Sequence, residues 1–291
     1  MQLSRIGLVV HPHRRLDGAL QTLRAWGAEV GAEIVQIAMP GQDREVAVAG
    51  EAASTDLVVA LGGDGTTLAA LRAAARVGKP VLGVACGSLG ALTATTAEEL
   101  DGALRAVSAG RWHARRLPGV AVKAEEAEHD VALNDLVIIR KGASQIAIEV
   151  RLDGELYGRF AGDGLVVATP LGSSAYTMAT GGPILAPGAD SMVVTPVAPH
   201  GGCIPPLVAG ADSVVTVEVV PGHAGARVEL DGQIRPIPSR RMEIRWRAAH
   251  ATLVAFDGAE SMLAGLRRRH IIMDSPRLLA RDDRAEATTR R

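Results

Sequence analysis

A carboxylate set among glycines is the part of this sequence best suited to chemistry. Asp64 lies in the segment Leu61-Gly-Gly-Asp-Gly-Thr-Thr67, directly after the apolar run Leu57–Leu61. Glycines let the backbone turn sharply, and the free N–H groups of a helix that starts here favour phosphate. A carboxylate repels phosphate unless a metal ion or a substrate hydroxyl lies between them. The segment therefore predicts a phosphate site in which Asp64 acts as a base or orients a metal ion.

The same segment has a simpler interpretation, and two familiar motifs are excluded. In the simpler interpretation it is a tight turn in which Asp64 caps a helix that starts near Thr66. The third glycine of a dinucleotide-binding fingerprint is missing. A P-loop is also excluded, because Gly78-Lys79-Pro80 has no Ser or Thr after the lysine.

Two further segments carry polar groups suited to a nucleotide. Residues 160–176 combine a second Gly-Asp-Gly with several hydroxyl side chains and Tyr176, one of two tyrosines. Such a loop offers donors to a sugar or phosphate and an aromatic face to a base. A glycine-rich hairpin is the alternative, but it does not account for the density of hydroxyl groups. The third segment, Leu133-Asn134-Asp135, precedes an apolar run and is by itself typical of a turn.

The elements around these segments change character along the chain. In the first third, short apolar runs at 6–10, 33–37, 57–61 and 81–84 alternate with helical spacing at 16–26, 67–76 and 97–107. This alternation predicts an α/β domain with an open parallel sheet over residues 1–110. Short β-branched runs separated by turn residues follow, and they predict a β-rich domain over 111–255. The remainder, 256–291, is weakly helical and ends in a polar segment, 282–291, that we expect to be frayed.

Composition excludes several classes of protein. The net charge of −1, from 31 basic and 32 acidic residues, provides no global field for nucleic acid or an anionic membrane. Two cysteines, Cys86 and Cys203, cannot build a disulfide framework, so we expect a reducing compartment. There is neither an apolar run of membrane-spanning length nor a signal-peptide core, so we expect a cytoplasmic location.

Five segments together resemble the NAD kinase family, bacterial type. They span roughly residues 57 to 235 and are Gly62–Thr66, Gly87–Thr93, Leu133–Asp135, Gly162–Tyr176 and Thr195–His200. The glycine–aspartate block alone is not specific, since lipid and sphingoid-base kinases share it, whereas the 162–176 block is. The resemblance implies an α/β domain, a β-rich domain and a final segment that packs back on the first domain.

The resemblance also implies an activity and a set of site residues. The activity is phosphoryl transfer from ATP or polyphosphate to the adenosine 2′-hydroxyl of NAD, giving NADP, assisted by a divalent metal such as Mg²⁺. Asp64 matches the catalytic aspartate of the family. The expected nucleotide- and phosphate-binding residues are Gly62, Gly63, Gly65, Thr66, Asn134, Asp135, Asp163, Thr169, Ser173, Ser174, Ala175, Tyr176 and Gln233. The family further suggests a homodimer or homotetramer.

Several positions depart from the family pattern and leave alternatives open. The usual Glu is Asp135, a common basic residue is Ala161, and Ala85 and Ile204 stand where other residues are customary. These changes lie around nucleotide recognition, while Asp64 and its glycines are intact. One alternative is a related kinase that phosphorylates another nucleotide or a polyol. A second is a nucleotide-binding sensor without turnover, although such a module has no evident need for Asp64.

Overall fold

The computed structural model describes residues 3–41, 43–124, 130–236, 240–279 and 281. The frayed tail expected at 282–291 lies outside these residues. The chain divides into two compact units, Met1–Phe256 and Asp257–Arg291. The first unit contains every segment singled out for nucleotide chemistry.

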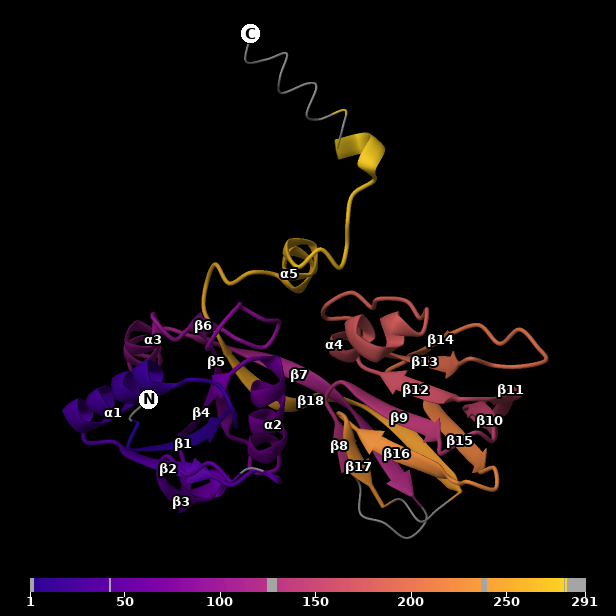
Figure 1. Cartoon of the computed structure of the whole chain (residues 1–291), viewed down its shortest axis with the longest axis horizontal. Helices are drawn as coiled ribbons and strands as arrows, with labels where there is room; N and C mark the ends of the chain where they lie inside the picture. The colour runs from indigo at the N-terminus through magenta and orange to yellow at the C-terminus, as the bar shows by residue number, and fades with distance from the viewer. Residues whose placement is uncertain (1–2, 42, 125–129, 237–239, 280, 282–291) are drawn as a thin grey trace. The chain divides into compact units, whose positions relative to one another are not determined.

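The first unit begins with a parallel sheet, as the alternating pattern predicts. Its strands lie in the order β5-β4-β1-β2-β3, with β4 at the point where the chain returns to the other side of β1 (Figure 1). All neighbouring pairs among them are parallel. The strands are β1 (Arg5–Val10), β2 (Glu33–Ile37), β3 (Val48–Gly50), β4 (Leu57–Gly62) and β5 (Pro80–Ala85).

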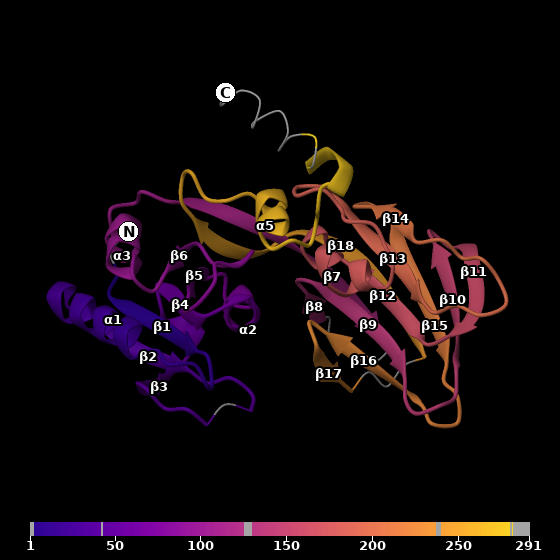
Figure 2. The same ribbon diagram turned by 45° about the horizontal axis from the view of Figure 1, so that its top comes forward.

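Helices cover both faces of this sheet. Helices α1 (Asp17–Val30) and α3 (Leu100–Ser108) share one buried apolar cluster with the sheet, and α2 (Asp64–Ala75) shares another (Figure 2). The apolar spacing of α1 buries Leu20, Leu23 and Trp26, as expected for one face of an amphipathic helix. Strands buried on both faces account for the near-continuous apolar runs in the sequence.

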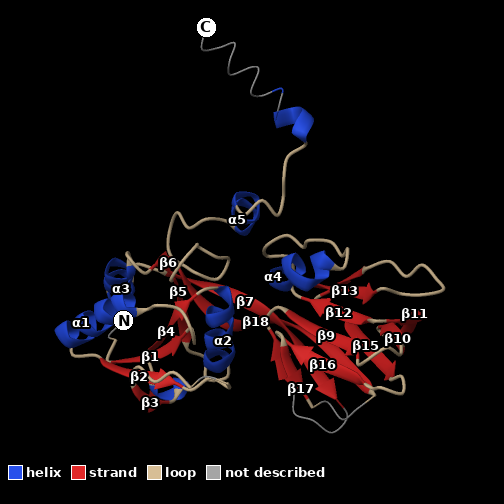
Figure 3. Cartoon of the chain, in the orientation of Figure 1, coloured by secondary structure: helices blue, strands red, loops and turns tan. Residues whose placement is uncertain are grey.

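The second part of this unit is built almost entirely of antiparallel strands (Figure 3). One sheet has the order β14-β13-β12-β9-β16-β17, and a second layer continues from the parallel sheet as β18-β15-β10-β11. Between the two layers lies a large apolar core drawn from both. The strands and the short helix here are β7 (His113–Ala124), β8 (Asp130–Ala132), β9 (Asp135–Arg140), β10 (Ile146–Leu152), β11 (Glu155–Gly162), β12 (Gly164–Ala168), α4 (Pro170–Gly172), β13 (Ser191–Val197), β14 (Leu207–Gly210), β15 (Val214–Val220), β16 (Ala226–Leu230), β17 (Gln233–Arg235) and β18 (Arg241–Ala255).

The long strand β18 belongs to both parts. Its first half pairs with β15, and its second half pairs in parallel with β5 at Thr252 and Leu253. Along its length it also pairs with β7, with an irregularity between Arg247 and Ala251. The parallel and antiparallel sheets are therefore one continuous sheet. The two-domain α/β and β-rich architecture is confirmed, while the boundaries at 110 and 255 stay predictions.

The second unit contains one short helix, α5 (Met262–Arg268). Ser261 caps it, since its Oγ accepts the N–H of Ala264 at 3.1 Å. Arg268 pairs with Glu260, and Arg267 pairs with Asp274. The weak helical pattern over 256–273 is thus confirmed for one turn and a half to two turns of helix, and the packing of this segment on the first domain stays a prediction. Across the described ranges, no helix is both long and apolar enough to cross a bilayer.

Candidate active site

A pocket of about 340 Å³ lies where the parallel sheet changes direction. Its walls come from the carboxyl ends of β1 and β4 and from the segment after β2, and they include Gly63, Asp64, Gly65 and Thr66. Strand β2 lies on one side of β1 and β4 on the other, so this is the topological switch point of the sheet. Open α/β sheets bind their ligands at such points. Four of the five residues predicted in the glycine–aspartate block meet here, while Gly62 is not in the lining.

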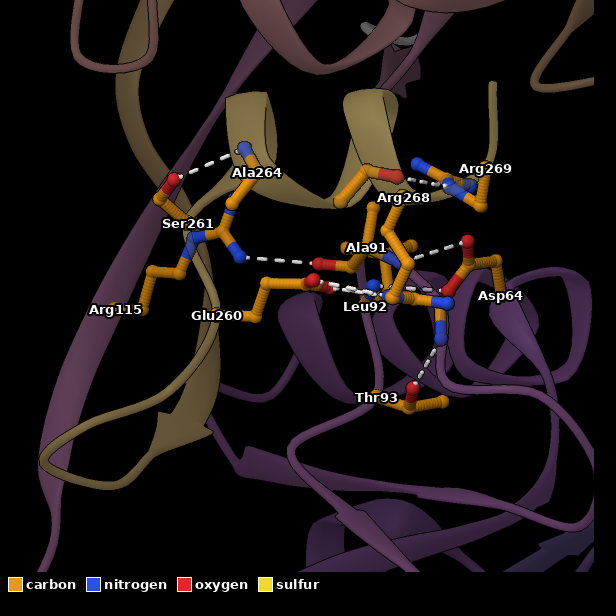
Figure 4. Close-up of polar contacts among 12 residues, drawn as sticks. Asp64, Ala91, Leu92, Thr93, Arg115, Glu260, Ser261, Ala264, Arg268 and Arg269 are labelled. Atoms are coloured by element: carbon orange, nitrogen blue, oxygen red, sulfur yellow. Dashed lines mark hydrogen bonds and ion pairs between the residues drawn. The ribbon is translucent and has the colours of Figure 1, made fainter. Parts of the chain in front are cut away.

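The Asp64 carboxylate is held by the loop after β5. Its Oδ2 accepts the N–H of Ala91 at 2.9 Å, and its Oδ1 accepts the N–H of Leu92 at 2.8 Å (Figure 4). The loop is itself closed by a bond from the Gly90 N–H to Thr93 Oγ1 at 2.8 Å. Two charge-assisted bonds fix the side chain in one orientation beside the pocket. The helix-cap interpretation did not anticipate this second loop.

Close approach explains why glycine occupies two positions of this site. A Cβ atom on Gly90 would lie 2.1 Å from Asp64 Oδ1, and one on Gly62 would lie 2.2 Å from Thr66 Oγ1. Neither distance is compatible with a side chain. Gly62 therefore serves the packing of Thr66 against β4, and Gly90 gives Asp64 room to reach the loop.

Arg115 supports the same loop from β7. Its Nη1 donates to the Ala91 carbonyl at 3.1 Å (Figure 4). Burial lowers the pKa of this guanidinium, and the nearby Asp64 carboxylate acts in the opposite direction. Arg115 thus places a positive charge behind the loop that orients Asp64.

Asn134 and Asp135 lie on the other side of the molecule's second sheet, at the start of β9, and Asp231 organises them. The Asp231 carboxylate accepts the N–H groups of Leu133 at 3.1 Å and Asn134 at 2.7 Å. Arg72 of α2 donates to the Asp231 carbonyl at 3.2 Å, which links this turn to the helix that begins at Asp64. In the described part of the chain, Asn134 Oδ1 is buried without a hydrogen-bond partner. A buried acceptor of this kind suits a ligand that donates a hydrogen bond.

Asp135 has an unusual electrostatic environment. It is 7% exposed. Burial, followed by the negative charges of Asp231 and Glu229, raises the pKa of Asp135 to about 7. Burial also raises the pKa of Asp231, while the backbone N–H groups that it accepts act in the opposite direction. Two buried carboxyl groups side by side disfavour double ionisation.

The 162–176 block folds into a short helical turn built on Asn134. Thr169 is fully buried: its Oγ1 donates to the Leu133 carbonyl at 2.6 Å and accepts the N–H of Gly172 at 3.2 Å. Ser173 is also fully buried, and its Oγ donates to Pro170 and accepts from Leu185. Both hydroxyls therefore have structural partners. Their assignment to ligand binding stays a prediction, and the geometry gives them a part in shaping the loop.

The remaining residues of the block are more accessible. Ser174 is half-buried and donates to the Leu171 carbonyl at 3.2 Å, and Ala175 is exposed. Ala175 also interrupts the helical turn, with φ of −108° and ψ of −112°. Tyr176 is half-buried and packs against the apolar cluster of β9, β12 and β13. These three present backbone and side-chain groups at the surface of the second sheet.

Asp163 and Gln233 lie apart from the pocket lining. Asp163, between β11 and β12, forms an ion pair with Arg140 Nε at 2.5 Å. Gln233 begins the edge strand β17 and is exposed. The structure thus gathers Asp64 with its glycines and Asn134 with Thr169, and it places these two residues elsewhere. All of these binding roles stay predictions.

Comparison with known proteins agrees with this architecture. The ATP-NAD kinase N-terminal domain model matches residues 7–112, and the C-terminal domain model matches residues 133–255. NAD kinase 1 of Streptomyces avermitilis is 34% identical over an alignment covering 96% of this chain and 90% of that protein. This chain belongs to the ATP-NAD kinase family.

Other relatives and solved structures of the family are also similar. The NAD kinase of Heliobacterium modesticaldum is 39% identical over 61% of this chain and 65% of that protein. Yeast NADH kinase complexed with NADH has the same fold, with a TM-score of 0.77 at 19% identity over 94% of this chain and 89% of that chain. An NAD kinase from Archaeoglobus fulgidus in complex with ATP gives 0.70 at 24% identity over 87% and 93% of the two chains.

The positions that depart from the family pattern have distinct structural settings. Ala85 is buried at the end of β5. The Ala161 carbonyl accepts the N–H of His200 at 2.8 Å, and Ile204 packs against the main β-rich core. Near the position of the missing basic residue, Arg140 of β9 supplies a cation to Asp163. The neighbourhood of the second Gly-Asp-Gly thus keeps a positive charge that comes from another strand.

Several residues at the pocket were missed by reasoning from the sequence. They are His11 and Arg14, which line it, and Arg44 and Arg115, which brace its loops. For the first two a usable signal existed, because His11-Pro-His-Arg14 directly follows an apolar strand, as Asp64 does. Arg44 and Arg115 lie in unremarkable sequence and needed the structure.

The donor groups fit magnesium bound through a substrate. Mg²⁺ keeps several waters and is usually held by one or two carboxylates together with substrate phosphates. Among the described residues, no group of three or more His, Cys, Asp or Glu side chains is placed to hold a metal ion. Asp64 provides one carboxylate beside a pocket suited to phosphate. This donor set fits an ion that arrives with the donor phosphates and does not fit a protein cage.

Proposed function

We propose that this protein is an NAD kinase that transfers the terminal phosphoryl group of ATP or polyphosphate to the adenosine 2′-hydroxyl of NAD, giving NADP. The observation that carries the proposal is the orientation of Asp64, whose two oxygens accept backbone N–H groups at the mouth of a phosphate-type pocket. The family of this chain supports the identity of both substrates. The alternatives of another acceptor or a non-catalytic sensor are not favoured by the relatives, which are named NAD kinases.

The arrangement can perform the transfer without a covalent intermediate. The 2′-oxygen forms a bond to the terminal phosphorus as the bond to the leaving phosphate oxygen breaks, and the hydroxyl proton passes to Asp64. Phosphoryl transfer depends mainly on alignment and on neutralised charge. The backbone N–H groups at the start of α2, at Gly65 and Thr66, face the pocket end of the helix and favour phosphate oxygens. When bound, Mg²⁺ would neutralise part of the phosphate charge.

The activity test compares the wild-type chain with Asp64→Asn. Wild-type protein with NAD, ATP and Mg²⁺ is expected to form NADP, measured with an NADP-specific dehydrogenase, and to stop when EDTA removes the metal. Asp64→Asn keeps the two backbone bonds but loses the base, so kcat should fall roughly 10²- to 10⁴-fold.

The matched control is Asp212→Asn, which removes a carboxylate at an exposed position. It should leave kcat unchanged, and urea unfolding of both variants should match the wild type. If wild-type protein forms no NADP with ATP or polyphosphate under any divalent metal, NAD is rejected as the acceptor. ATP consumption screened over nucleosides and polyols would then identify the alternative acceptor.

We further expect a homodimer or homotetramer that works in the cytoplasm. The support is the family itself together with the cysteine content and the balanced charge of the sequence. Sedimentation equilibrium of the full chain measures the oligomeric state directly.

A further inference from the structure

We propose that the loop His11–Arg14, at the end of β1, is the subsite for the phosphate chain of the donor, with Arg14 as the cation for the transferred group. The inference rests on the proposed function. It goes further by assigning the pocket to the donor and not to NAD, and by giving a specific residue the charge neutralisation. The ligand chemistry is a triphosphate or longer polyphosphate chain, whether or not it carries a nucleoside.

The first observation is the place of the Arg14 guanidinium. Its Nη1 donates to the Cys86 carbonyl at 3.3 Å, so it reaches from the end of β1 to the end of β5. A Cβ atom on Gly87 would lie 2.9 Å from this Nη1, and one on Gly63 would lie 3.7 Å from it. Arg14 therefore lies against two glycine backbones, one of which directly precedes Asp64.

The second observation is that the loop is held in shape by its own contacts. His11 Nδ1 accepts the N–H groups of His13 at 3.1 Å and Arg14 at 3.2 Å. Burial, and then the charges of Arg14, His13 and Arg44, lower the pKa of His11, in keeping with a neutral ring whose Nδ1 is an acceptor.

Arg44 completes this loop from the segment after β2. Its Nη1 donates to the carbonyls of His11 at 3.2 Å and Arg14 at 2.6 Å. Carbonyl oxygens that would repel a phosphate are thus bound to a cation instead. The result is a preorganised loop at the edge of the pocket, which lowers the entropic cost of binding a ligand.

The third observation concerns charge. Within the described ranges, no carboxylate forms an ion pair with Arg14, whereas Arg105 pairs with both Glu29 and Asp101. The amino end of α2 adds its positive dipole at the same pocket. An arginine offers a planar fork of donors that matches phosphate oxygens. A pocket with these groups is suited to a chain of phosphates.

The fourth observation separates the donor from the acceptor. The pocket is lined only by residues between Val9 and Ala69, all of them in the α/β part. Asn134 and the 162–176 block, which the family pattern assigns to the nucleotide, lie on the second sheet and are not in this lining. Asp64 is the one predicted catalytic group in the pocket wall. The phosphate donor therefore enters on the side of β1, and the sugar hydroxyl reaches Asp64 from the other.

The test uses the full chain with three variants. Arg14→Gln removes the cation, Arg14→Lys keeps a charge without the fork, and Arg15→Gln is the matched control at the next, exposed position. Calorimetry with ATP, with inorganic tripolyphosphate and with NAD measures each ligand separately at fixed salt. Arg14→Gln is expected to weaken ATP and tripolyphosphate about tenfold to hundredfold, and NAD less than about twofold. Arg14→Lys should fall between, and Arg15→Gln should match the wild type.

Steady-state kinetics give a second readout. Arg14→Gln should raise KM for the donor and lower kcat, while KM for NAD stays unchanged. Weaker NAD binding with unchanged tripolyphosphate binding would assign the pocket to the acceptor and overturn the inference. Unchanged binding of all three ligands would overturn it as well. If Arg14→Gln proves unstable to urea, the comparison of Arg14→Lys with wild type decides.

The two proposals fail in different ways. A wild-type chain that makes no NADP but binds tripolyphosphate through Arg14 contradicts the proposed function and supports the subsite. A wild-type chain that makes NADP, with Arg14→Gln behaving like it, contradicts only the subsite.

Discussion

At the scale of single residues, the site depends on what a neighbouring loop does to one carboxylate. Asp64 is the first residue of α2, yet both of its oxygens bond to the loop after β5. Gly90 makes this possible by leaving the space that a side chain would fill. Asp135 shows the opposite case, since burial beside other acids favours its neutral form.

Gly90→Ala should separate orientation from folding. The added Cβ would lie 2.1 Å from Asp64 Oδ1, so either the loop or the carboxylate must move. A displacement near 1 Å at a reacting group costs about 10² in rate, so kcat should fall by roughly that factor. Gly102→Ala in α3 is the control, because nothing lies within 4 Å of its Cβ. It should raise the free energy of unfolding by about 0.5–1 kcal/mol without changing kcat. A fully active Gly90→Ala enzyme would refute this account of Asp64.

Asp135→Asn should change how stability depends on pH. The folded-state pKa of about 7 lies above the ordinary value of 3.8, so between these values the folded state binds more protons. The wild type therefore loses stability as pH rises from about 4 to 7 through this group. Asn cannot ionise, so its stability relative to wild type should grow by roughly 1–4 kcal/mol from pH 4 to pH 8.

Urea unfolding at several pH values measures this difference, and Asp190→Asn, at an exposed position, is the control. A stability difference between Asp135→Asn and wild type that does not vary with pH would show that the Asp135 carboxyl is ionised in the folded state throughout.

At the scale of elements, the site is assembled by loops that end parallel strands and are braced from behind. The loops after β1, β4 and β5 meet through Arg14, Asp64 and the backbone of Ala91. Arg115 of β7 binds the Ala91 carbonyl and thereby ties the last of these loops to the antiparallel strands. Loops positioned by a rigid scaffold are where function is usually found.

Arg115→Met should act on catalysis through this loop. The substitution keeps an apolar stem but removes the bond to Ala91 and the charge behind Asp64. We expect kcat to fall about tenfold or more, with KM for both substrates changed less, because the ground-state contacts remain. Arg115→Lys should restore part of the rate. The control is Arg111→Met, at an exposed position before β7. Equal kcat values for Arg115→Met and Arg111→Met would show that the brace has no catalytic effect.

At the scale of the whole molecule, residues 1–256 form one compact unit because two cores share a strand. The first half of β18 contributes Met242 and Ile244 to the β-rich core, and its second half contributes Val254 to a core of the parallel sheet. Unfolding one core therefore removes a strand from the other. This coupling also holds the two groups of predicted site residues in one frame.

Single-tryptophan variants should show one cooperative transition for this unit. Trp26 is buried in the α/β part, and Trp246 packs on the β-rich core. Fluorescence of variants that keep only one of them should give coincident urea midpoints, as two-state unfolding requires. Each variant's own stability is checked by circular dichroism. Midpoints that differ between the two probes, with matching dichroism, would show that the parts unfold independently.

Much of the fold followed from local pattern. Apolar runs and helical spacing predicted the parallel strands and α1 to α3 within a few residues, since burial on one or both faces dictates these periods. Strand β18 was missed, because its alternation of charged and apolar residues, as in Arg241-Met-Glu-Ile-Arg245, is spread over a strand that changes partners midway. Strands β11, β14 and β17 were missed as well, being short or lying at sheet edges.

The sequence by itself determined the chemistry of Asp64 and its glycines, because residue types and their place after a buried strand are local properties. It also determined the family, through the order and spacing of its motifs. Only the tertiary structure decided which groups act on that carboxylate. Arg14, Ala91 and Arg115 come from three segments far apart in the chain, and their meeting depends on strand order. The same holds for Thr169 and Ser173, whose hydroxyls look available in sequence and are buried against backbone in the fold.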